Sequence, residues 1–367
     1  MESGAKLYRV SPFIAWCGAG LSNLLTGKTV GLSRATWCSV LGLGDRFTLP
    51  DVERQLGLSH ELATSFLARL IGARLVLPDD ESVFANYAVR YVDIEITSHC
   101  NARCRFCPVS ADPLPRRFMP RDVFLTVLSR LEGYPVKWVA LNHYNEPLLD
   151  PDFLEKVRLL DRSGLALRLF TNGMLLRPEI SDELSAIGNV ESIIVNIPTD
   201  NPREYEERMG VRMLPGLLSQ VRYAAAKGLR VVICINGTDQ ISQRWAKTAH
   251  GVLGESVHVH LNSTHDRAGH VGGAPEVQEA GHWSGPLMGC RRALEHLHVN
   301  VDGWVYLCCQ DYHQQHLLGD VSSSSIREIM TGVEAVGLRR RIFGEGPAPM
   351  DFICRSCVEL LRERRAC

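Results

Sequence analysis

The stretch EITSHCNARCRFCPVS, which runs from Glu95 to Ser110, contains three cysteines within eight residues. Cys100, Cys104 and Cys107 follow the spacing C-x3-C-x2-C, and the next cysteine is more than a hundred residues away. Structural zinc sites and ordinary iron–sulfur clusters take four protein ligands. Three thiolates on one loop instead suit a [4Fe–4S] cluster with one iron left open to a small ligand. The alternatives are incidental cysteines or a zinc knuckle, for which only the adjacent His99 offers a fourth ligand.

The composition is that of a globular protein with a large core. Hydrophobic residues make up 45% of the 367 residues and charged residues 22%. The net charge of -1 implies no basic surface for phosphates, so nucleic acid is not an expected partner. Neither an apolar run long enough to span a membrane nor a signal-peptide core is apparent, so we expect a cytoplasmic protein. In that reducing compartment, clustered cysteines indicate metal ligands rather than disulfides.

Strands and helices alternate from Tyr91 onward. The expected strands are YVDIEIT, VKWVALN, ALRLFTN, ESIIVNI, RVVICIN and SVHVHLN, and amphipathic helical segments separate them. This alternation predicts an α/β fold, namely a partial (β/α)6 TIM-type barrel with a parallel sheet inside and helices outside. In such barrels the chemistry takes place at the carboxyl ends of the strands, where the cysteine loop begins.

The cysteine loop, with Phe106 just before its third cysteine, resembles that of the radical S-adenosylmethionine (radical SAM) superfamily. The resemblance implies that the open iron of the cluster binds S-adenosylmethionine. An electron from the cluster then cleaves this cofactor to methionine and a 5′-deoxyadenosyl radical, which abstracts a hydrogen atom from the substrate. A flavodoxin or a ferredoxin is the expected electron donor.

Further positions match this family in order along the chain. Asn145-Glu146-Pro147 occupies the place of the family's Gly-Gly-Glu-Pro motif, which implies that Glu146 binds the methionyl amino group. The glycines of that motif are replaced here, so the match to the motif is better supported at Glu146 than at the residues beside it. Thr171, Asn172 and Asn196 follow at later strand ends and are expected to contact S-adenosylmethionine. For any one of them, a helix cap or a turn is the structural alternative.

A second set of cysteines lies near the C-terminus. Its members are Cys290, Cys308, Cys354 and Cys357. They could supply four ligands for a second [4Fe–4S] cluster, or for zinc in a four-cysteine ribbon. The spacing resembles the auxiliary-cluster domains called SPASM and twitch, and the single-cluster twitch form is favoured because few cysteines follow Cys357. Cys309 is expected to be a packed thiol or a substitute ligand, and Cys367 has no assigned role.

The first 85 residues differ in character from the rest. A hairpin that turns at Thr26-Gly27, three short helices and the strand RLVLP predict a winged-helix-like module. The third helix should bury a stripe formed by Leu62, Phe66, Leu67 and Leu70. It lacks a basic face for DNA, and the module resembles the peptide-recognition elements of radical SAM enzymes that modify ribosomally made peptides.

Three domains are therefore expected: a winged-helix-like module at residues 1–85, the barrel at 86–282 and a small α+β twitch domain at 283–367. In the third domain, Asp302-Gly303 should form a hairpin turn and SIREIMTGVEAVGLRRRIF a helix. Arg267 follows the sixth strand, where it could contact an acidic substrate group or form a structural salt bridge. His258 and His260 alternate along that strand and could face the barrel interior or be satisfied core residues.

The predicted function is radical modification of a ribosomally made peptide by crosslinking, thioether formation, epimerisation or oxidation. The alternative is a dehydrogenase or epimerase of a small molecule, such as an aminocyclitol, sugar or nucleoside, in antibiotic biosynthesis. A third class, a DNA-binding iron–sulfur regulator, is disfavoured by the three-cysteine site and the missing basic helix.

Overall fold

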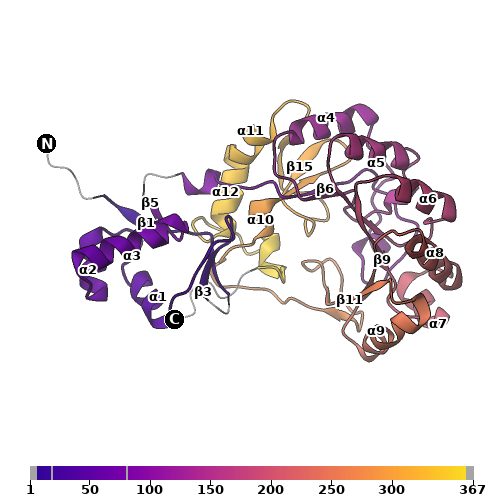
Figure 1. Ribbon diagram of the computed structural model, residues 1–367, viewed down its shortest axis with the longest axis horizontal. Helices are drawn as coiled ribbons and strands as arrows, with labels where there is room; N and C mark the ends of the chain where they lie inside the picture. The colour runs from indigo at the N-terminus through magenta and orange to yellow at the C-terminus, as the bar shows by residue number, and fades with distance from the viewer. Residues whose placement is uncertain (1–5, 18–19, 80–81, 361–367) are drawn as a thin grey trace.

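Six parallel strands form the centre of the chain, as expected from the sequence. The computed structural model describes residues 6–17, 20–79 and 82–360 (Figure 1). The strands are β6 Tyr91–Ile94, β7 Trp138–Ala140, β8 Leu167–Thr171, β9 Val190–Asn196, β10 Val231–Asn236 and β11 His258–Asn262. Each strand pairs in parallel with its sequence neighbour, so all their carboxyl ends lie at one edge. The fold is a partial TIM-type barrel, and this prediction is confirmed.

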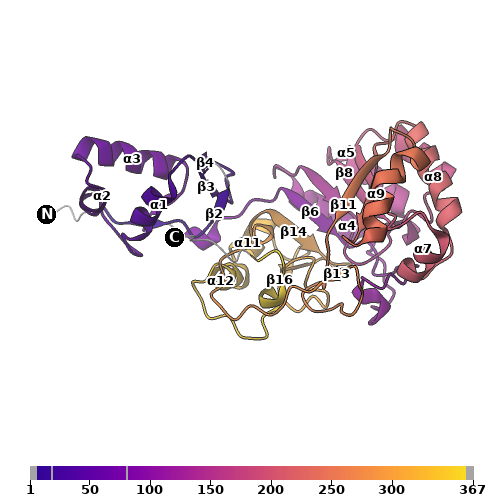
Figure 2. The ribbon, with the colours of Figure 1, turned by 90° about the horizontal axis from the view of Figure 1, so that it is seen from below.

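Helices cover the outer face of the six strands (Figures 1 and 2). They are α4 Arg121–Leu131, α5 Phe153–Arg162, α6 Pro178–Ala186, α7 Pro202–Met209, α8 Leu214–Ala226 and α9 Gln240–Leu253. The sequence analysis missed α7, whose residues PREYEERM are mostly polar. The side chain of Asn201 caps this helix by accepting hydrogen bonds from the backbone N–H groups of Arg203 and Glu204, at 3.0 and 3.2 Å.

The barrel sheet continues into the C-terminal unit. Its order is β11-β10-β9-β8-β7-β6-β14-β15-β16, in which β14 His296–Val299 pairs in parallel with β6. The remaining elements are β15 Trp304–Tyr306, β16 Leu317–Asp320, the short pair β12 Thr264–His265 and β13 Val277–Gln278, and the helix α10 Arg292–Glu295. The expected turn is present, with Gly303 at a φ of 89°. One sheet thus crosses the boundary predicted at residue 283, and the domain limits stay predictions.

The long helix expected near the C-terminus is two helices, so this part of the prediction is wrong. They are α11 Ile326–Thr331 and α12 Val333–Ile342. Gly332 between them is extended, with φ -66° and ψ 163°, which ends the first helix and begins the second. Short 3-10 turns also occur at Val83–Ala85, Pro108–Ser110, Pro147–Leu149 and Ile353–Ser356.

The N-terminal module has the predicted hairpin and three helices. Its elements are β1 Tyr8–Val10, β2 Ile14–Cys17, β3 Gly20–Asn23, β4 Thr29–Val30, α1 Arg34–Leu41, α2 Leu49–Leu56, α3 His60–Gly72 and β5 Val76–Pro78. β5 pairs with β1, and β2, β3 and β4 form a separate antiparallel sheet. The predicted apolar stripe of α3 is wrong at Leu62, which is 59% exposed, because Ala63 faces the core in its place. The winged-helix assignment stays a prediction.

The N-terminal module packs against the C-terminal unit rather than against the barrel helices (Figure 2). The ring of Phe13 meets the ring of Phe343 edge to face, with the centroids 4.8 Å apart. Arg9 and Glu345 form an ion pair across the same junction. In the described part of the chain, no helix combines the length and apolarity that a membrane span requires.

Candidate active site

The three cysteines of the opening stretch lie together on the loop that follows β6. Cys100, Cys104 and Cys107 line one cavity of about 480 Å³ at the carboxyl end of the barrel. Burial raises the pKa of the Cys100 thiol to about 11 and that of Cys104 well above its usual value. Repulsion from the other two thiolates raises the pKa of Cys104 further. Three buried thiolates at this spacing call for a positively charged partner.

The cysteine loop is attached to the end of α7. The backbone N–H groups of Arg103 and Arg105 donate hydrogen bonds to the carbonyl oxygens of Met209 and Arg208, both at 3.0 Å. Gly210, which follows α7, has a left-handed φ of 70°. A Cβ atom there would lie 2.8 Å from the carbonyl oxygen of Arg103, so only glycine allows this close approach.

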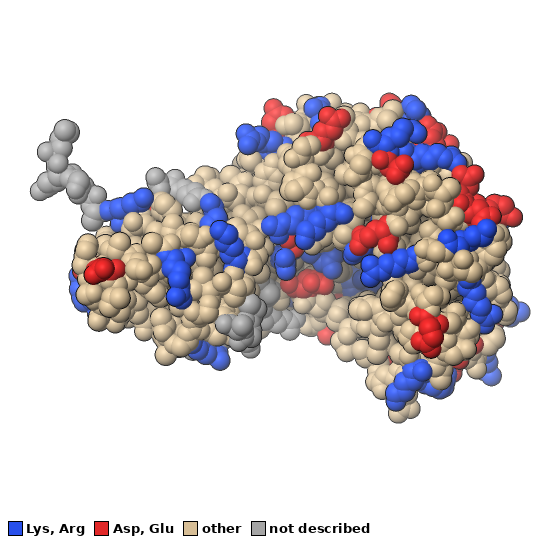
Figure 3. Space-filling model, in the orientation of Figure 1, with Lys and Arg blue, Asp and Glu red and all other residues tan. Residues whose placement is uncertain are grey.

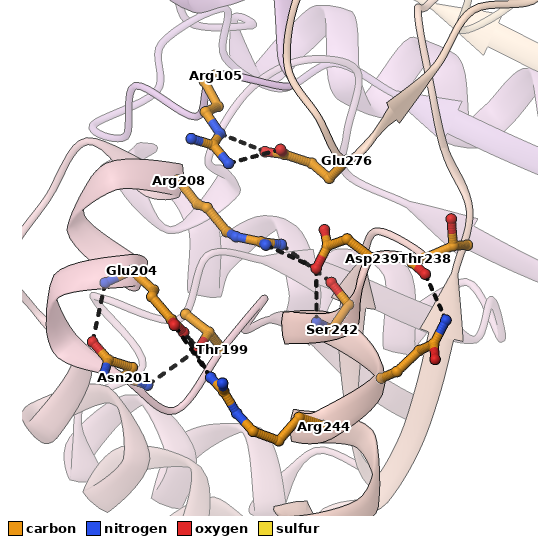
Figure 4. Close-up of polar contacts among 11 residues, drawn as sticks. Arg105, Thr199, Asn201, Glu204, Arg208, Thr238, Asp239, Ser242, Arg244 and Glu276 are labelled. Carbon is orange, nitrogen blue, oxygen red and sulfur yellow. Dashed lines mark hydrogen bonds and ion pairs between the residues drawn. The ribbon is translucent and has the colours of Figure 1, made fainter.

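Two ion pairs hold the same loop from the outside, as Figure 4 shows. Arg105 donates two hydrogen bonds to the fully buried carboxylate of Glu276, at 2.6 and 2.8 Å. Arg208 donates to Asp239 at 3.0 Å, and Asp239 caps α9 by accepting from the backbone of Ser242. The cysteine loop is therefore fastened directly to the segment after β11, and α7, to which the loop is attached, is fastened to α9.

Glu146 lies at the centre of a hydrogen-bond network beside the cysteine loop. Its carboxylate accepts from the Thr171 hydroxyl and from the backbone N–H of Asn172, both at 2.7 Å. The side-chain amide of Asn172 donates to Asn101 on the cysteine loop, also at 2.7 Å. The side chain of Glu146 is fully buried, and this desolvation raises its pKa to about 7 despite the hydrogen bonds it accepts. The structure thus brings Glu146, Thr171 and Asn172 together.

Asn196 belongs to a row of asparagines along the strand ends. Asn236 donates a side-chain hydrogen bond to Asn196 at 3.0 Å, and Asn262 donates to Asn236 at 3.2 Å. All three residues line the cavity and end β9, β10 and β11. The sequence analysis missed Asn236 and Asn262, although each ends its strand as Asn196 does, and that repetition was the available signal.

Arg267 lies in the same cavity wall, where its backbone adopts a left-handed φ of 52°. Its Nε atom is buried and has no hydrogen-bond partner among the described residues. Burial raises the pKa of Cys107, and the guanidinium of Arg267 offsets part of this rise, which indicates that the two side chains are neighbours. His258 and His260 do not join this site: both are exposed on β11, the edge strand of the sheet.

The second set of cysteines lies in the C-terminal unit, within an apolar cluster that includes Leu287, Leu307 and Phe352. Burial raises the pKa of Cys308 well above its usual value, and the neighbouring thiolates raise it further, those of Cys290, Cys354 and Cys357 among them. The four predicted ligands are therefore close together.

Cys309, next to Cys308, lines the barrel cavity instead. Its Sγ atom accepts a hydrogen bond from Arg292 at 3.4 Å. It lies outside the apolar cluster, but its charge raises the pKa values of Cys308 and Cys357 in addition to the effect of burial, so its role as a packed thiol or a substitute ligand stays a prediction. Cys367 lies outside the described residues.

Two protein families match the chain over these same segments. Residues 94–250 match the radical SAM superfamily, and residues 290–358 match the SPASM iron-sulfur cluster-binding domain. The chain belongs to the radical SAM superfamily. Its C-terminal unit is a SPASM-type domain, and both domains imply iron–sulfur clusters.

Curated relatives of this radical SAM chain match it over only part of its length. A tungsten-containing aldehyde ferredoxin oxidoreductase cofactor-modifying protein of Pyrococcus furiosus is 36% identical over 101 residues, 27% of this chain and 28% of the relative. An AdoMet-dependent heme synthase of Methanosarcina barkeri is 30% identical over 125 residues, 34% of this chain and 35% of the relative. The chain spans less than half the length of the curated relatives it matches.

Solved structures share the fold over a larger part of the chain. Streptococcus suis SuiB bound to the precursor peptide SuiA is 13% identical with a TM-score of 0.58, covering 95% of this chain and 93% of SuiB. BtrN in complex with AdoMet and 2-DOIA is 18% identical with a TM-score of 0.50, covering 71% of this chain and 89% of BtrN. At these identities the likeness concerns the fold alone.

The side chains present fit the groups that radical SAM and SPASM domains carry. Three clustered thiols at the cavity and four in the C-terminal unit are donor sets that iron–sulfur clusters take. Mutual repulsion among the thiolates in each set is what bound iron would relieve.

The attachment of the cysteine loop to α7 leads to a prediction. We expect Gly210→Ala to lower the iron bound at the first site, because its Cβ would displace the Arg103 backbone. Gly228→Ala is the matched control, since Gly228 has a similar φ of 83° but nothing within 4 Å of an added Cβ. Both changes should cost about 1–2 kcal/mol of stability for the left-handed conformation. Equal iron content in the two variants, measured after reconstitution, would contradict the prediction.

Proposed function

We propose that this radical SAM enzyme modifies a ribosomally made peptide, which its N-terminal module holds while the barrel cavity carries out the chemistry. The observation that best supports a peptide substrate is the small sheet β2-β3-β4. Strands β2 and β4 each have one partner among the described residues, so each offers an edge to which an extended peptide can add.

The hydrogen-bond pattern identifies the open side of β2. The backbone N–H of Leu24 donates to the carbonyl oxygen of Phe13, and Asn23 donates instead toward β4. Because backbone groups alternate in direction along an antiparallel strand, those of Ile14 and Trp16 point away from β3. Ile14 is fully buried, so the backbone groups of the half-buried Trp16 are those that a docked strand would meet.

The surroundings of this module also support a peptide. A second cavity, of about 630 Å³, lies where the module meets the C-terminal unit, with Ile14 and Leu41 on one side and Leu287 and Phe343 on the other. The structure of SuiB bound to its precursor peptide SuiA matches 95% of this chain, a span that includes residues of the module.

Within the barrel cavity, we assign Cys100, Cys104 and Cys107 to the radical-generating cluster. When bound, the cluster and S-adenosylmethionine supply a 5′-deoxyadenosyl radical that abstracts a hydrogen atom from the substrate. The Glu146 carboxylate would accept a hydrogen bond from the cofactor's ammonium group, and Thr171 and Asn172 hold that carboxylate in position. Asn196 would orient the remainder of the cofactor from the next strand end.

Cationic side chains that line the same cavity would position the substrate. Arg267 has a buried, unpartnered Nε atom in the part of the chain that the structure describes, and it lines the cavity with Arg292. A guanidinium binds a carboxylate with two parallel hydrogen bonds, so we assign Arg267 to an acidic group of the substrate. Cys290, Cys308, Cys354 and Cys357 would hold one auxiliary cluster.

The test of the peptide assignment uses a proline on the open edge of β2. Trp16→Pro removes a backbone N–H that points outward, and edge strands tolerate proline there. With a short peptide encoded beside this gene as substrate, Trp16→Pro should raise KM well above that of the Trp16→Ala control. Substrate-free release of 5′-deoxyadenosine should be the same in both variants. Equal KM values, or no modified peptide by mass spectrometry with the parent enzyme, would overturn the assignment.

A small-molecule substrate is the second candidate. It is favoured by the fold shared with BtrN, which was solved in complex with AdoMet and 2-DOIA, and by Arg267 and Arg292 in the cavity wall. The enzyme would then be a radical dehydrogenase or epimerase, and an aminocyclitol would stimulate 5′-deoxyadenosine release where peptides do not.

A further inference from the structure

Asp93, His296 and His298 form a compact cluster that none of the cofactor sites above uses. One ligand atom from each residue can be chosen so that all three lie within 4.8 Å of one another. Asp93 and His296 also line the barrel cavity, whereas the side chain of His298 is fully buried beside them. The cluster therefore lies in the wall of the same cavity as the cysteine loop.

The parallel pairing of β6 with β14 creates this cluster. In that register His296 lies opposite Tyr91, and His298 lies opposite Asp93. Side chains two residues apart on a strand share a face, and paired residues of neighbouring strands share it too. Both histidines and the aspartate are therefore directed to the same side of the sheet.

The distances within the cluster match the spacing of neighbouring ligands around a shared cation. The Asp93 Oδ2 atom lies 3.1 Å from His298 Nδ1 and 3.7 Å from His296 Nδ1. Neighbouring ligands around a four-coordinate zinc ion are about 3.3 Å apart, given bonds of about 2.0–2.1 Å. The two observed distances lie on either side of this value.

The orientation of the imidazole rings supports the same interpretation. Neither His298 nitrogen nor the His296 Nδ1 atom has a hydrogen-bond partner among the described residues, although the Asp93 carboxylate is so close. The two rings lie nearly parallel, 10° apart, with centroids separated by 5.8 Å. Ligands of one metal ion point at a common third position rather than at each other, which gives short contacts without aligned hydrogen bonds.

The surroundings would shield a bound ion from bulk water on most sides. Tyr91 and Trp138 pack against the His296 ring, with centroids at 4.8 and 6.1 Å. Tyr306 packs against the His298 ring at 5.6 Å. The cluster is open on the cavity side, where the side chains of Asp93 and His296 are 17% and 13% exposed.

We propose that Asp93, His296 and His298 bind one divalent transition-metal ion, Zn²⁺ or Fe²⁺, with an open coordination position toward the barrel cavity. Two imidazoles and a carboxylate are a ligand set that both ions accept. Sites with three protein ligands keep a position for water or substrate, so the ion would bind an oxygen atom of the molecule being modified. This site is separate from both sets of cysteines.

Zinc binding to the holoenzyme tests the proposal. The cluster-loaded protein is incubated with zinc chloride and desalted, and its zinc is measured by mass spectrometry and by X-ray absorption at the zinc edge. We expect about one zinc ion per chain with nitrogen and oxygen ligands at about 2.0–2.1 Å. Less than one ion for every five chains, or sulfur in the first shell, would overturn the proposal.

The variant Asp93→Asn keeps the shape of the aspartate, and His296→Gln replaces the imidazole by a neutral polar side chain of similar length. Each should lower the zinc affinity by more than about 100-fold, since even the loss of an outer partner of a ligand typically costs 10–100-fold. The control is His258→Gln with His260→Gln, which changes two exposed histidines at the same spacing on β11. Zinc binding that survives in Asp93→Asn and His296→Gln, or is lost in the control, would contradict the assignment. The iron content of each variant reports whether it has folded. If a variant has not folded, the X-ray absorption spectrum of the parent enzyme alone decides whether zinc has nitrogen and oxygen ligands.

Discussion

Cys104→Ala should abolish the release of 5′-deoxyadenosine in the presence of dithionite and S-adenosylmethionine, while about half of the bound iron remains. The physical reason is that the first cluster has only three protein ligands, so the loss of one leaves too few to hold it. The auxiliary site has its own four cysteines and should keep its cluster. Total iron should therefore fall from about eight to about four per chain.

Cys234→Ala is the matched control for this experiment. Cys234 lines the same cavity, and burial raises the pKa of its thiol to about 11, as it does for Cys100. It lies on β10, away from the cysteine loop, and should be dispensable for both clusters. Activity that persists in Cys104→Ala, or iron that is lost equally in Cys234→Ala, would refute the assignment of the radical-generating site.

The affinity for S-adenosylmethionine should rise with pH up to about 7 and then level off. In the ligand-free chain, burial raises the pKa of Glu146 to about 7, so the carboxyl is largely neutral at pH 6. The cofactor's ammonium group needs the ionised carboxylate, so the affinity should fall about ten-fold for each pH unit below 7. The same shift makes the ligand-free chain most stable below the usual glutamate pKa, with stability declining as the pH rises to about 7.

Glu146→Gln should weaken S-adenosylmethionine binding by about 10–100-fold at pH 8 and abolish its pH dependence, because a charge-assisted hydrogen bond is lost. The new amide would also place a donor against the Asn172 backbone N–H or the Thr171 hydroxyl. Isothermal titration at several pH values measures both effects. His99→Gln is the control, since His99 also titrates near the site and its pKa is lowered by burial. If the pH dependence disappears in His99→Gln and persists in Glu146→Gln, then Glu146 is not its origin.

Local patterns predicted most of the secondary structure. All six barrel strands occur at the apolar segments that predicted them. The failures also have local causes. α7 is too polar to show an apolar stripe, and Gly332 divides one amphipathic segment into two helices.

Site residues were predictable where a short spacing carried the chemistry. Cys100, Cys104 and Cys107 lie within eight residues, so one loop is enough to bring their thiols together. Glu146, Thr171 and Asn172 were predicted from the family resemblance, and they lie together because strand ends in a parallel sheet meet at one edge. By contrast, nothing in the segment around Glu276 indicated that its carboxylate would hold Arg105 on the cysteine loop.

The sequence by itself determined the radical SAM motif, the parallel strands and the two sets of cysteines, because each depends on neighbours in the chain. Only the tertiary structure decided that β14 pairs with β6, joining segments about two hundred residues apart. That pairing brings His296 and His298 to Asp93, and the structure likewise places Cys309 in the barrel cavity while Cys308 joins the auxiliary set. Such contacts depend on how the elements pack, so the periodicity of residues along the chain does not predict them.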